Sequence, residues 1–385
     1  MPWTKTSAEL IVGSHSSSRC TVYISSPITM WGINLDPDVP MVYSIFGVQY
    51  LGEIPNTRQQ ILIDTFTKLI DSSAKHVDHV LQQDSLAQTR IWLAYWSSPA
   101  SYKAWWLAAE TVQFWDSLTP DAGMWREILT VPRRRTQFGT NKEENNGLAH
   151  VGTLTPNTTK SGYWGCYRDR IEAATSTDRL DTPLSRSPTP QLSSTTVRLG
   201  RVRVNKLPDN LCFVVEGQDH SGITATEKDH WFENFDEPVT KWITDIVAAG
   251  AEAGVLTSRL CFAPESGKFR DSDPTPLNYN RKIQLFYFLD FGHMERIGRH
   301  NKGHVGLRSS FMQSYCPLGP MGKLGQLLLW VETSILKSEE IECEYVGCLV
   351  GTGLMAYDHH PAFGSAKNKQ NLLSISWLKS WFVSS

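Results

Sequence analysis

The sequence lacks the signals that would direct it to a membrane, a secretory route or a nucleic acid. No apolar run among its 385 residues approaches the length of a membrane-spanning helix. The first residues, MPWTKTSAEL, contain no apolar stretch of the signal-peptide kind. The formal net charge is −2, so no excess of basic residues favours nucleic acid or an anionic lipid surface. We therefore expect a cytoplasmic protein that binds neither nucleic acid nor membrane.

Cysteine is present without a pattern. The seven cysteines are odd in number and form no CxxC pair, so the sequence favours reduced thiols over a disulfide framework. The absence of CxxCH also excludes covalent attachment of a c-type haem through that motif. What remains is an ordinary globular composition, 41% hydrophobic and 20% charged, in a chain long enough for two packed units.

Two series of strand and helix patterns predict an α+β fold. The first series has expected strands at residues 41–51, 90–96, 148–154 and 162–170, and expected helices at 61–70 and 102–115. The second has expected strands at 211–218, 256–263, 282–289, 327–335 and 342–348, and expected helices at 224–249 and 291–311. Each series approximates the order β-α-β-β-α-β of a ferredoxin-like unit. Thr224 is the expected N-cap of its helix, and Arg133–Arg135 are expected to be solvated.

This reading divides the chain into five parts. A stretch rich in Ser, Thr and Pro separates the two series and is expected to be a linker. The expected parts are an N-terminal arm at 1–40, a first ferredoxin-like unit at 41–177, the linker at 178–206, a second unit at 207–356 and a C-terminal tail at 357–385.

Three histidines gather in the segment FGHMERIGRHNKGHVGLRSSF, residues 291–311. Its spacing predicts a helix with a partly apolar face, in which Val305 is apolar and Arg308 lies on the solvated side. His300 and His304 can share a helix face, but no HExxH pattern or third ligand accompanies them, so a zinc site is not indicated. From these residues alone, His304 is either a packed histidine or a metal ligand.

A resemblance bears on that choice. The residues ERIGRHNKGH, 295–304, resemble the haem-ligand segment of the aldoxime dehydratases, a family of haem-containing dehydratases. Five further segments are similar and occur in the same order: FGVQYLGE at 46–53, GYWGCYRDRI at 162–171, EGQDH at 216–220, LLWVETSI at 328–335 and EYVGCLVGTGLM at 344–355. The resemblance implies two ferredoxin-like units around one haem b, with ferrous iron in the active state, and the conversion of an aldoxime to a nitrile and water.

The family's site residues carry over position by position. The resemblance implies His304 as the axial iron ligand and Arg170 as the distal arginine that orients the departing hydroxyl. Arg168, two residues earlier, is the alternative and is expected on the cofactor side. An ordinary salt bridge to Asp169 or Glu172 is the other interpretation of Arg170.

The sequence also departs from the family at three polar positions. Glu216 stands where the family has a distal serine, Val331 where it has a distal histidine that lines the cofactor pocket, and Gly139 where it has a glutamate. Glu216 is therefore the expected second catalytic residue, as an acid, a base or a substrate anchor, unless it only forms an ion pair with Arg170. Two histidines, His220 and His293, are candidate replacement proton donors. Strand alternation turns Glu332 to the other face, where a structural role is expected.

These features leave several functions open. The first is a haem-dependent lyase that acts on an aldoxime, with an aromatic or arylalkyl oxime favoured by the 14 tryptophans. The alternatives are a different haem-dependent reaction in small-molecule biosynthesis, a non-catalytic haem sensor, and a protein without cofactor. A homodimer is one option for its assembly.

Overall fold

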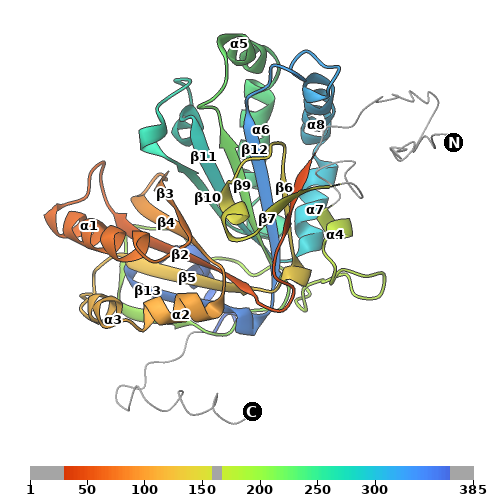
Figure 1. The fold of residues 1–385 in the computed structure, drawn as a ribbon. Helices are drawn as coiled ribbons and strands as arrows, with labels where there is room; N and C mark the ends of the chain where they lie inside the picture. The colour runs from red at the N-terminus through yellow and green to blue at the C-terminus, as the bar shows by residue number, and fades with distance from the viewer. Residues whose placement is uncertain (1–29, 158–166, 365–385) are drawn as a thin grey trace.

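A single large sheet organises the fold. The computed structural model describes residues 30–157 and 167–364, and within them the strands form one 13-stranded sheet with helices outside it (Figure 1). Every strand pairing in this sheet is antiparallel. The expected α+β class is confirmed.

The first half of the chain folds into a β-α-β-β-α-β arrangement, but its second and fourth strands lie at residues 76–83 and 124–131, where no strand was expected, and its second α position is split into two helices. Its elements are β2 (Met41–Tyr50), α1 (Thr57–Asp71), β3 (His76–Gln83), β4 (Gln88–Trp96), α2 (Pro99–Trp106), α3 (Ala109–Asp116) and β5 (Met124–Val131). The strands lie in the spatial order β3-β4-β2-β5. The order places the first and third strands of the series in the middle, as in a ferredoxin-like unit.

The second series repeats the arrangement. Its elements are β9 (Leu211–Asp219), α5 (Ala225–Asn234), α6 (Asp236–Ala249), β10 (Val255–Phe262), β11 (Arg281–Phe288), α7 (Phe291–His300), α8 (Lys302–Tyr315) and β12 (Leu328–Leu336). The spatial order β12-β9-β11-β10 is the same as in the first series. These two four-stranded parts of the one sheet, called the first and the second sheet below, join edge to edge where β10 pairs with β3, at Cys261 opposite Gln82 and Phe262 opposite Leu81.

Five further strands tie the halves together. They are β1 (Trp31–Asn34), β6 (Thr136–Thr140), β7 (Thr153–Pro156), β8 (Val197–Val204) and β13 (Ile341–Leu349). β6 follows the first series in the chain but pairs with β12, whereas β13 follows the second series but pairs with β5. β1 lies within the expected arm and pairs with β6 and β7, and β8 lies within the expected linker and forms an edge of the sheet beside β13.

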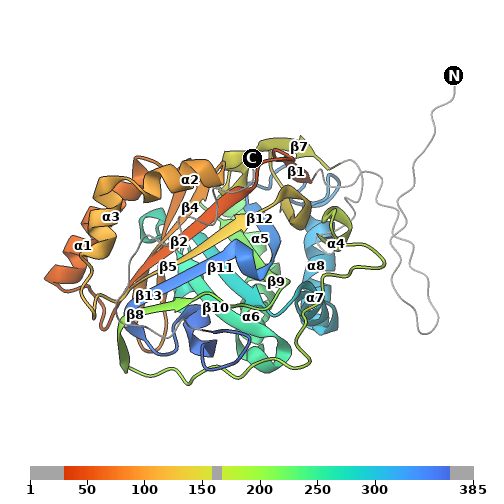
Figure 2. The same ribbon diagram turned by 90° about the horizontal axis from the view of Figure 1, so that it is seen from below.

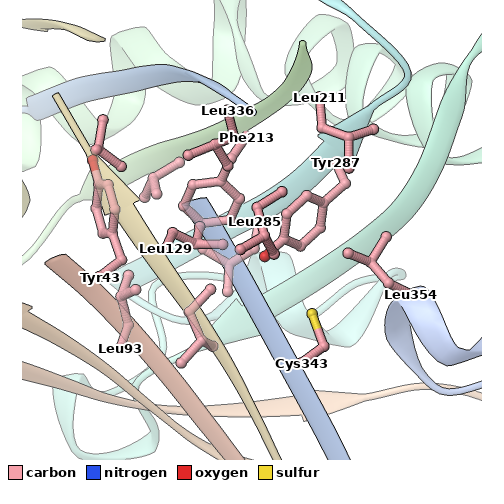
Figure 3. Packing of buried hydrophobic residues seen from close by; sticks show 14 of the residues in the cluster. Tyr43, Leu93, Leu129, Leu211, Phe213, Leu285, Tyr287, Leu336, Cys343 and Leu354 are labelled. Carbon is pink, nitrogen blue, oxygen red and sulfur yellow. The ribbon is translucent and has the colours of Figure 1, made fainter. Parts of the chain in front are cut away.

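The main apolar core lies between the two halves. Helices α1 to α3 cover one outer side and α5 to α8 the other, so the inner faces of the two sheets meet (Figures 1 and 2). Figure 3 shows this contact, with Tyr43 and Leu129 from the first half and Phe213, Leu285 and Tyr287 from the second. Because successive side chains of a strand point to opposite faces, the residues between these core positions face the outer helices.

Five expected elements are interrupted or changed; one of them, the expected strand at 148–154, is a 3-10 helix at 147–151 followed by β7. The expected helix at 291–311 breaks at Asn301, whose extended backbone ends α7 and whose side chain caps α8 by accepting from the His304 N–H at 2.8 Å. Similar breaks divide the expected helices at 102–115 and 224–249, although Thr224 caps α5 as expected. The expected strand at 162–170 lies partly outside the described residues, and its last part is instead the short helix α4 (Tyr167–Arg170).

Some residues expected at the surface are buried. Arg135 is 2% exposed because its guanidinium pairs with Glu340 at 2.9 Å. Tyr357 and Phe363, at the start of the expected tail, belong to the core between the two halves. In the part of the chain that the structure describes, no helix is both long and apolar enough to span a membrane.

Candidate functional site on the helix-facing side of the second sheet

An apolar cluster fills the space between the second sheet and its helices. It contains buried side chains from β9, β11, β12 and α6, among them Val214, Phe286, Val331 and Trp242. Leu307 of α8 packs against the same cluster. Polar side chains on this face of the sheet are therefore exceptions that need a partner or a function.

Glu216 is the first such exception. It is directly opposite Val331 of β12 on one side and Gln284 of β11 on the other. The side chain is partly buried, and its carboxyl forms neither a hydrogen bond nor an ion pair with any described residue. Burial raises the pKa of Glu216 to about 7, with no opposing contribution from a cation. The alternative in which Glu216 forms an ion pair with Arg170 is thus wrong.

The three positions that depart from the resemblance form one row. Val331 pairs with Glu216 on β9 and with Gly139 on β6, so the three positions lie side by side across adjacent strands. Val331 is 2% exposed. The row has a carboxyl at one end, an apolar side chain in the middle and no side chain at the other end.

Arg170 is held over this face from α4. Its Nε donates to Oε1 of Gln137 at 3.1 Å, and the Gln137 amide donates to the Thr333 hydroxyl at 3.0 Å. Thr333 is two residues from Val331 on β12 and therefore faces the same side. The salt-bridge alternative with Glu172 is not observed, because Glu172 pairs with Arg133 at 3.0 Å.

Arg168 has a different environment. Its Nε and Nη2 both donate to one oxygen of Glu295 on α7, at 3.1 and 2.9 Å, and its guanidinium lies 4.5 Å from the centre of the Phe291 ring. These contacts fasten α4 to α7. Arg170 is therefore the arginine of this pair that reaches the sheet face, while the expected cofactor contact of Arg168 stays a prediction.

The imidazole of His304 on α8 is held by two contacts. Its Nδ1 lies 2.9 Å from the carbonyl oxygen of Gly298, and its ring stacks on Trp242 with centroids 3.9 Å apart. A carbonyl only accepts, so Nδ1 carries the proton, and the lone pair is on Nε2. Burial lowers the pKa of His304, which favours the neutral imidazole.

The position of His304 on α8 relates it to the sheet. Leu307 and Phe311 follow at helical spacing on the same side, and both pack into the apolar clusters under the helix. A groove of about 420 Å³ between α6 and α8 is lined in part by His304 and Trp242. Two expectations about this helix are wrong: Val305 is 46% exposed, and burial of Arg308 lowers its pKa to about 10.

This donor set fits a non-covalently bound haem. An imidazole with Nδ1 anchored and Nε2 available is the form that binds iron, and the apolar side chains of the second-sheet cluster are of the kind that pack against a macrocycle. The carboxyl of Glu216, unpartnered within the described residues, is a group that a bound molecule can satisfy. The assignment of His304 as the iron ligand stays a prediction.

The other candidates lie apart from this row. His293 bonds to Asp290 at 2.7 Å on α7 and lines a separate surface cavity. His220 follows the last residue of β9 and stacks on Phe269. Burial holds the pKa of His220 well below the usual range. Glu332 points into the core between the halves, as expected, and accepts from the Tyr43 hydroxyl at 2.8 Å.

Sequence reasoning missed Gln284. It stands in the otherwise apolar strand KIQLFYF and is fully buried on the same face as Phe286. The signal that could have found it is the polar residue at an alternation position that should be apolar.

Comparisons with known proteins agree with one another. A family model for haem-containing dehydratases matches residues 44–354. The chain is 28% identical to the phenylacetaldoxime dehydratase of Bacillus sp. (strain OxB-1), over 74% of this chain and 78% of the relative. It is 24% identical to the aliphatic aldoxime dehydratase of Rhodococcus globerulus, over 86% of this chain and 90% of the relative.

Solved structures show the same fold. The crystal structure of an aldoxime dehydratase in complex with butyraldoxime matches with a TM-score of 0.69 at 19% identity, covering 88% of this chain and 92% of that one. A second aldoxime dehydratase structure gives a TM-score of 0.68 at 19% identity, covering 88% and 94%.

Proposed function

Because the chain belongs to the haem-containing dehydratase family, we propose that it is a haem-dependent lyase that dehydrates an aldoxime, or acts on a related substrate with an N–O bond. The observation that carries this proposal is the state of His304, whose anchored Nδ1 leaves Nε2 for iron. The haem is proposed to be b-type and ferrous in the active state. When bound, such a haem supplies an electron-rich iron for the nitrogen of the substrate.

The chain's own residues then handle the hydroxyl and the protons. Arg170 is permanently charged and is oriented by Gln137, so it can hold the departing oxygen and offset negative charge that develops there. Glu216 carries a proton below pH 7 and can deliver it to that oxygen, so that water leaves. After transfer its carboxylate can accept the C–H proton, which completes the loss of water from R–CH=N–OH.

The substrate and setting are part of the same proposal. One relative is named for phenylacetaldoxime and another for aliphatic aldoximes; we favour an aromatic or arylalkyl oxime because the sequence is rich in tryptophan. The division into units at 41–177 and 207–356, the assembly as a homodimer and the cytoplasmic location are also proposed.

A second function is favoured by one specific feature. The row from Glu216 through Val331 to Gly139 contains a single titratable side chain, where the family resemblance implies polar groups at all three positions. A pocket changed in this way suits a different haem-dependent reaction in small-molecule biosynthesis, one that does not end in a nitrile.

One experiment separates these functions. The purified, haem-loaded chain is mixed under anaerobic, dithionite-reduced conditions with phenylacetaldoxime and with an aliphatic oxime, while the Soret band and the products are followed. Nitrile formation with a Soret shift supports dehydration. A faster rate for the reduced protein than for the air-oxidised protein supports the ferrous state. A Soret shift with another product identifies the second function. A shift without turnover indicates a sensor, and a protein that takes up no haem contradicts both enzymatic functions.

A further inference from the structure

Gln284 is a buried amide without a partner. Its side chain is 0% exposed, and neither its amide nitrogen nor its amide oxygen forms a hydrogen bond with any described residue. Leaving such a group unsatisfied destabilises a folded protein unless something binds there. A ligand that forms hydrogen bonds with the Gln284 amide would therefore satisfy it.

The neighbours of Gln284 define where that ligand lies. Leu260 of β10 is opposite on one side and Glu216 of β9 on the other. Lys282, two residues along the same face, is turned away, because its ammonium group donates to the backbone carbonyls of Tyr279 and Leu277 at 2.8 and 3.3 Å. Glu216 is thus the polar neighbour of Gln284 whose side chain forms no hydrogen bond or ion pair with another described residue.

The two side chains are close enough to share one group. Residues directly opposite each other on antiparallel strands have Cβ atoms about 5 Å apart. The amide of Gln284 and the carboxyl of Glu216 can bond to each other across that distance, yet they do not. Both are left available to a third group, and Glu216 is the more exposed of the two, so a ligand approaches Gln284 from the Glu216 side.

We propose that Gln284 and Glu216 form a polar subsite that binds an uncharged group carrying both a hydrogen-bond donor and an acceptor on the substrate. The amide of Gln284 offers N–H donors on its nitrogen and an acceptor on its oxygen, side by side, which matches such a group and not a single charge. Two sources have this chemistry: the N–OH group that reacts, and a carboxamide elsewhere in the substrate. The proposal rests on the proposed function only for the choice of an N–O compound as ligand. It makes Gln284 a determinant of substrate specificity.

The test compares Gln284→Met with a matched control. Methionine has nearly the same length but no polar atoms to leave unsatisfied. Gln218→Met makes the same chemical change two residues from Glu216 on the same face of β9. For each haem-loaded variant, the dissociation constant is measured by calorimetry for three probes: phenylacetaldoxime, its O-methyl ether, and an oxime of similar size bearing a terminal carboxamide. The melting temperature without ligand is measured as well.

If Gln284 determines specificity, its replacement should weaken binding without lowering the melting temperature. If Gln284 is structural, its replacement should lower the melting temperature and leave binding unchanged. We expect Gln284→Met to raise the melting temperature by about 2 °C, because a buried unsatisfied amide is removed. We also expect it to weaken binding by about tenfold, the value of one or two hydrogen bonds. Gln218→Met should leave the binding of all three probes nearly unchanged.

The probes identify which group the subsite holds. A loss for phenylacetaldoxime but not for its O-methyl ether shows that it holds the reacting N–OH. A loss confined to the carboxamide probe shows that it holds a substituent. A lowered melting temperature with unchanged binding of every probe overturns the proposal. Because these measurements are of binding and stability, they stand whether or not a nitrile is formed.

Discussion

The Nδ1 atom of His304 lies 2.9 Å from the carbonyl oxygen of Gly298, across the break between α7 and α8. The contact depends on Asn301, which ends α7 and caps α8. A continuous helix would direct each backbone carbonyl to the N–H four residues later, whereas the break leaves the Gly298 carbonyl for the imidazole. The interruption of the helix therefore fixes the histidine tautomer.

Replacing His304 with alanine should abolish haem binding while the secondary structure is kept. The side chain packs on Trp242 at the edge of the cluster and not in its centre, so the fold should tolerate its loss. The Soret band and the far-ultraviolet circular dichroism spectrum measure the two properties. His300→Ala is the control, because His300 is exposed at the end of α7. A His304→Ala protein that retains a full Soret band would disprove the assignment.

Arg170 should matter more for turnover than Arg168. Arg170→Lys removes the planar donor that Gln137 orients, and we expect turnover to fall by roughly 10²-fold with little loss of haem. Arg168→Lys instead weakens the attachment of α4 to Glu295 of α7, so it should lower stability by about 1 kcal/mol and turnover only slightly. Steady-state rates and urea unfolding compare the two variants, and a larger rate loss for Arg168→Lys would reverse their roles.

The titration of Glu216 should appear in the pH profile. Burial raises its pKa to about 7, so the protonated acid is the main form below pH 7 and is lost above it. If this proton goes to the leaving hydroxyl, kcat should decline as pH rises through about 7, and Glu216→Gln should lose most of its activity while its Soret band is unchanged. Full activity and an unaltered profile in Glu216→Gln would mean that the proton comes from another source.

The second half of the chain could largely be predicted from local patterns, whereas β3, β5 and β6 of the first half were not expected. Runs of β-branched and aromatic residues located strands such as β2 and β9, most of whose residues are buried. The helix breaks were missed because they do not interrupt the apolar period. The break between α7 and α8 depends on the capping side chain of Asn301, whereas the breaks at Ala108 and Phe235 have no side-chain cap. The placement of β8 and β13 was also missed, since strand partners distant in sequence are set by tertiary packing and not by local propensity.

The site could be predicted only in part. Resemblance selected His304, Arg170 and Glu216 as candidates, and their roles stay predictions; the residues alone left His304 open between packing and ligation. Whether Glu216 is paired with Arg170 depends on which side chain Arg170 reaches, and this proved to be Gln137. Gln284 needs the register of β9 against β11 before its position beside Glu216 can be recognised.

Glu332 should make stability fall with rising pH. Burial raises its pKa from 4.5 to about 8 although Tyr43, Tyr95 and the Leu148 N–H donate to it. A raised pKa in the folded state means that its contribution is fully present below 4.5 and is lost as pH rises through about 8. At about 1.4 kcal/mol per pKa unit, the loss is at most ~5 kcal/mol.

The isosteric Glu332→Gln variant isolates this effect. Glutamine can keep the acceptor for Leu148 and donate to the Tyr43 hydroxyl, but it does not ionise. Urea unfolding at pH 6 and pH 9 should show a clear decrease in unfolding free energy for the natural protein and a smaller decrease for Glu332→Gln. Glu342→Gln, whose side chain is 69% exposed, serves as the control and should behave like the natural protein. Equal decreases in all three proteins would show that Glu332 is not the responsible group.

Restoring the family's pair of distal residues should move the chain toward ordinary aldoxime dehydration. Val331 is 2% exposed, so Val331→His alone should overpack the row and destabilise the protein by about 1–3 kcal/mol. Combining it with Glu216→Ser frees volume directly opposite, and Gly139 leaves space on the other side. We therefore expect the double variant to recover a melting temperature near that of the natural protein and to form nitrile from phenylacetaldoxime faster, as measured by mass spectrometry of the products. A stable, haem-loaded double variant that forms nitrile no faster than the natural protein would show that these two positions do not determine the reaction.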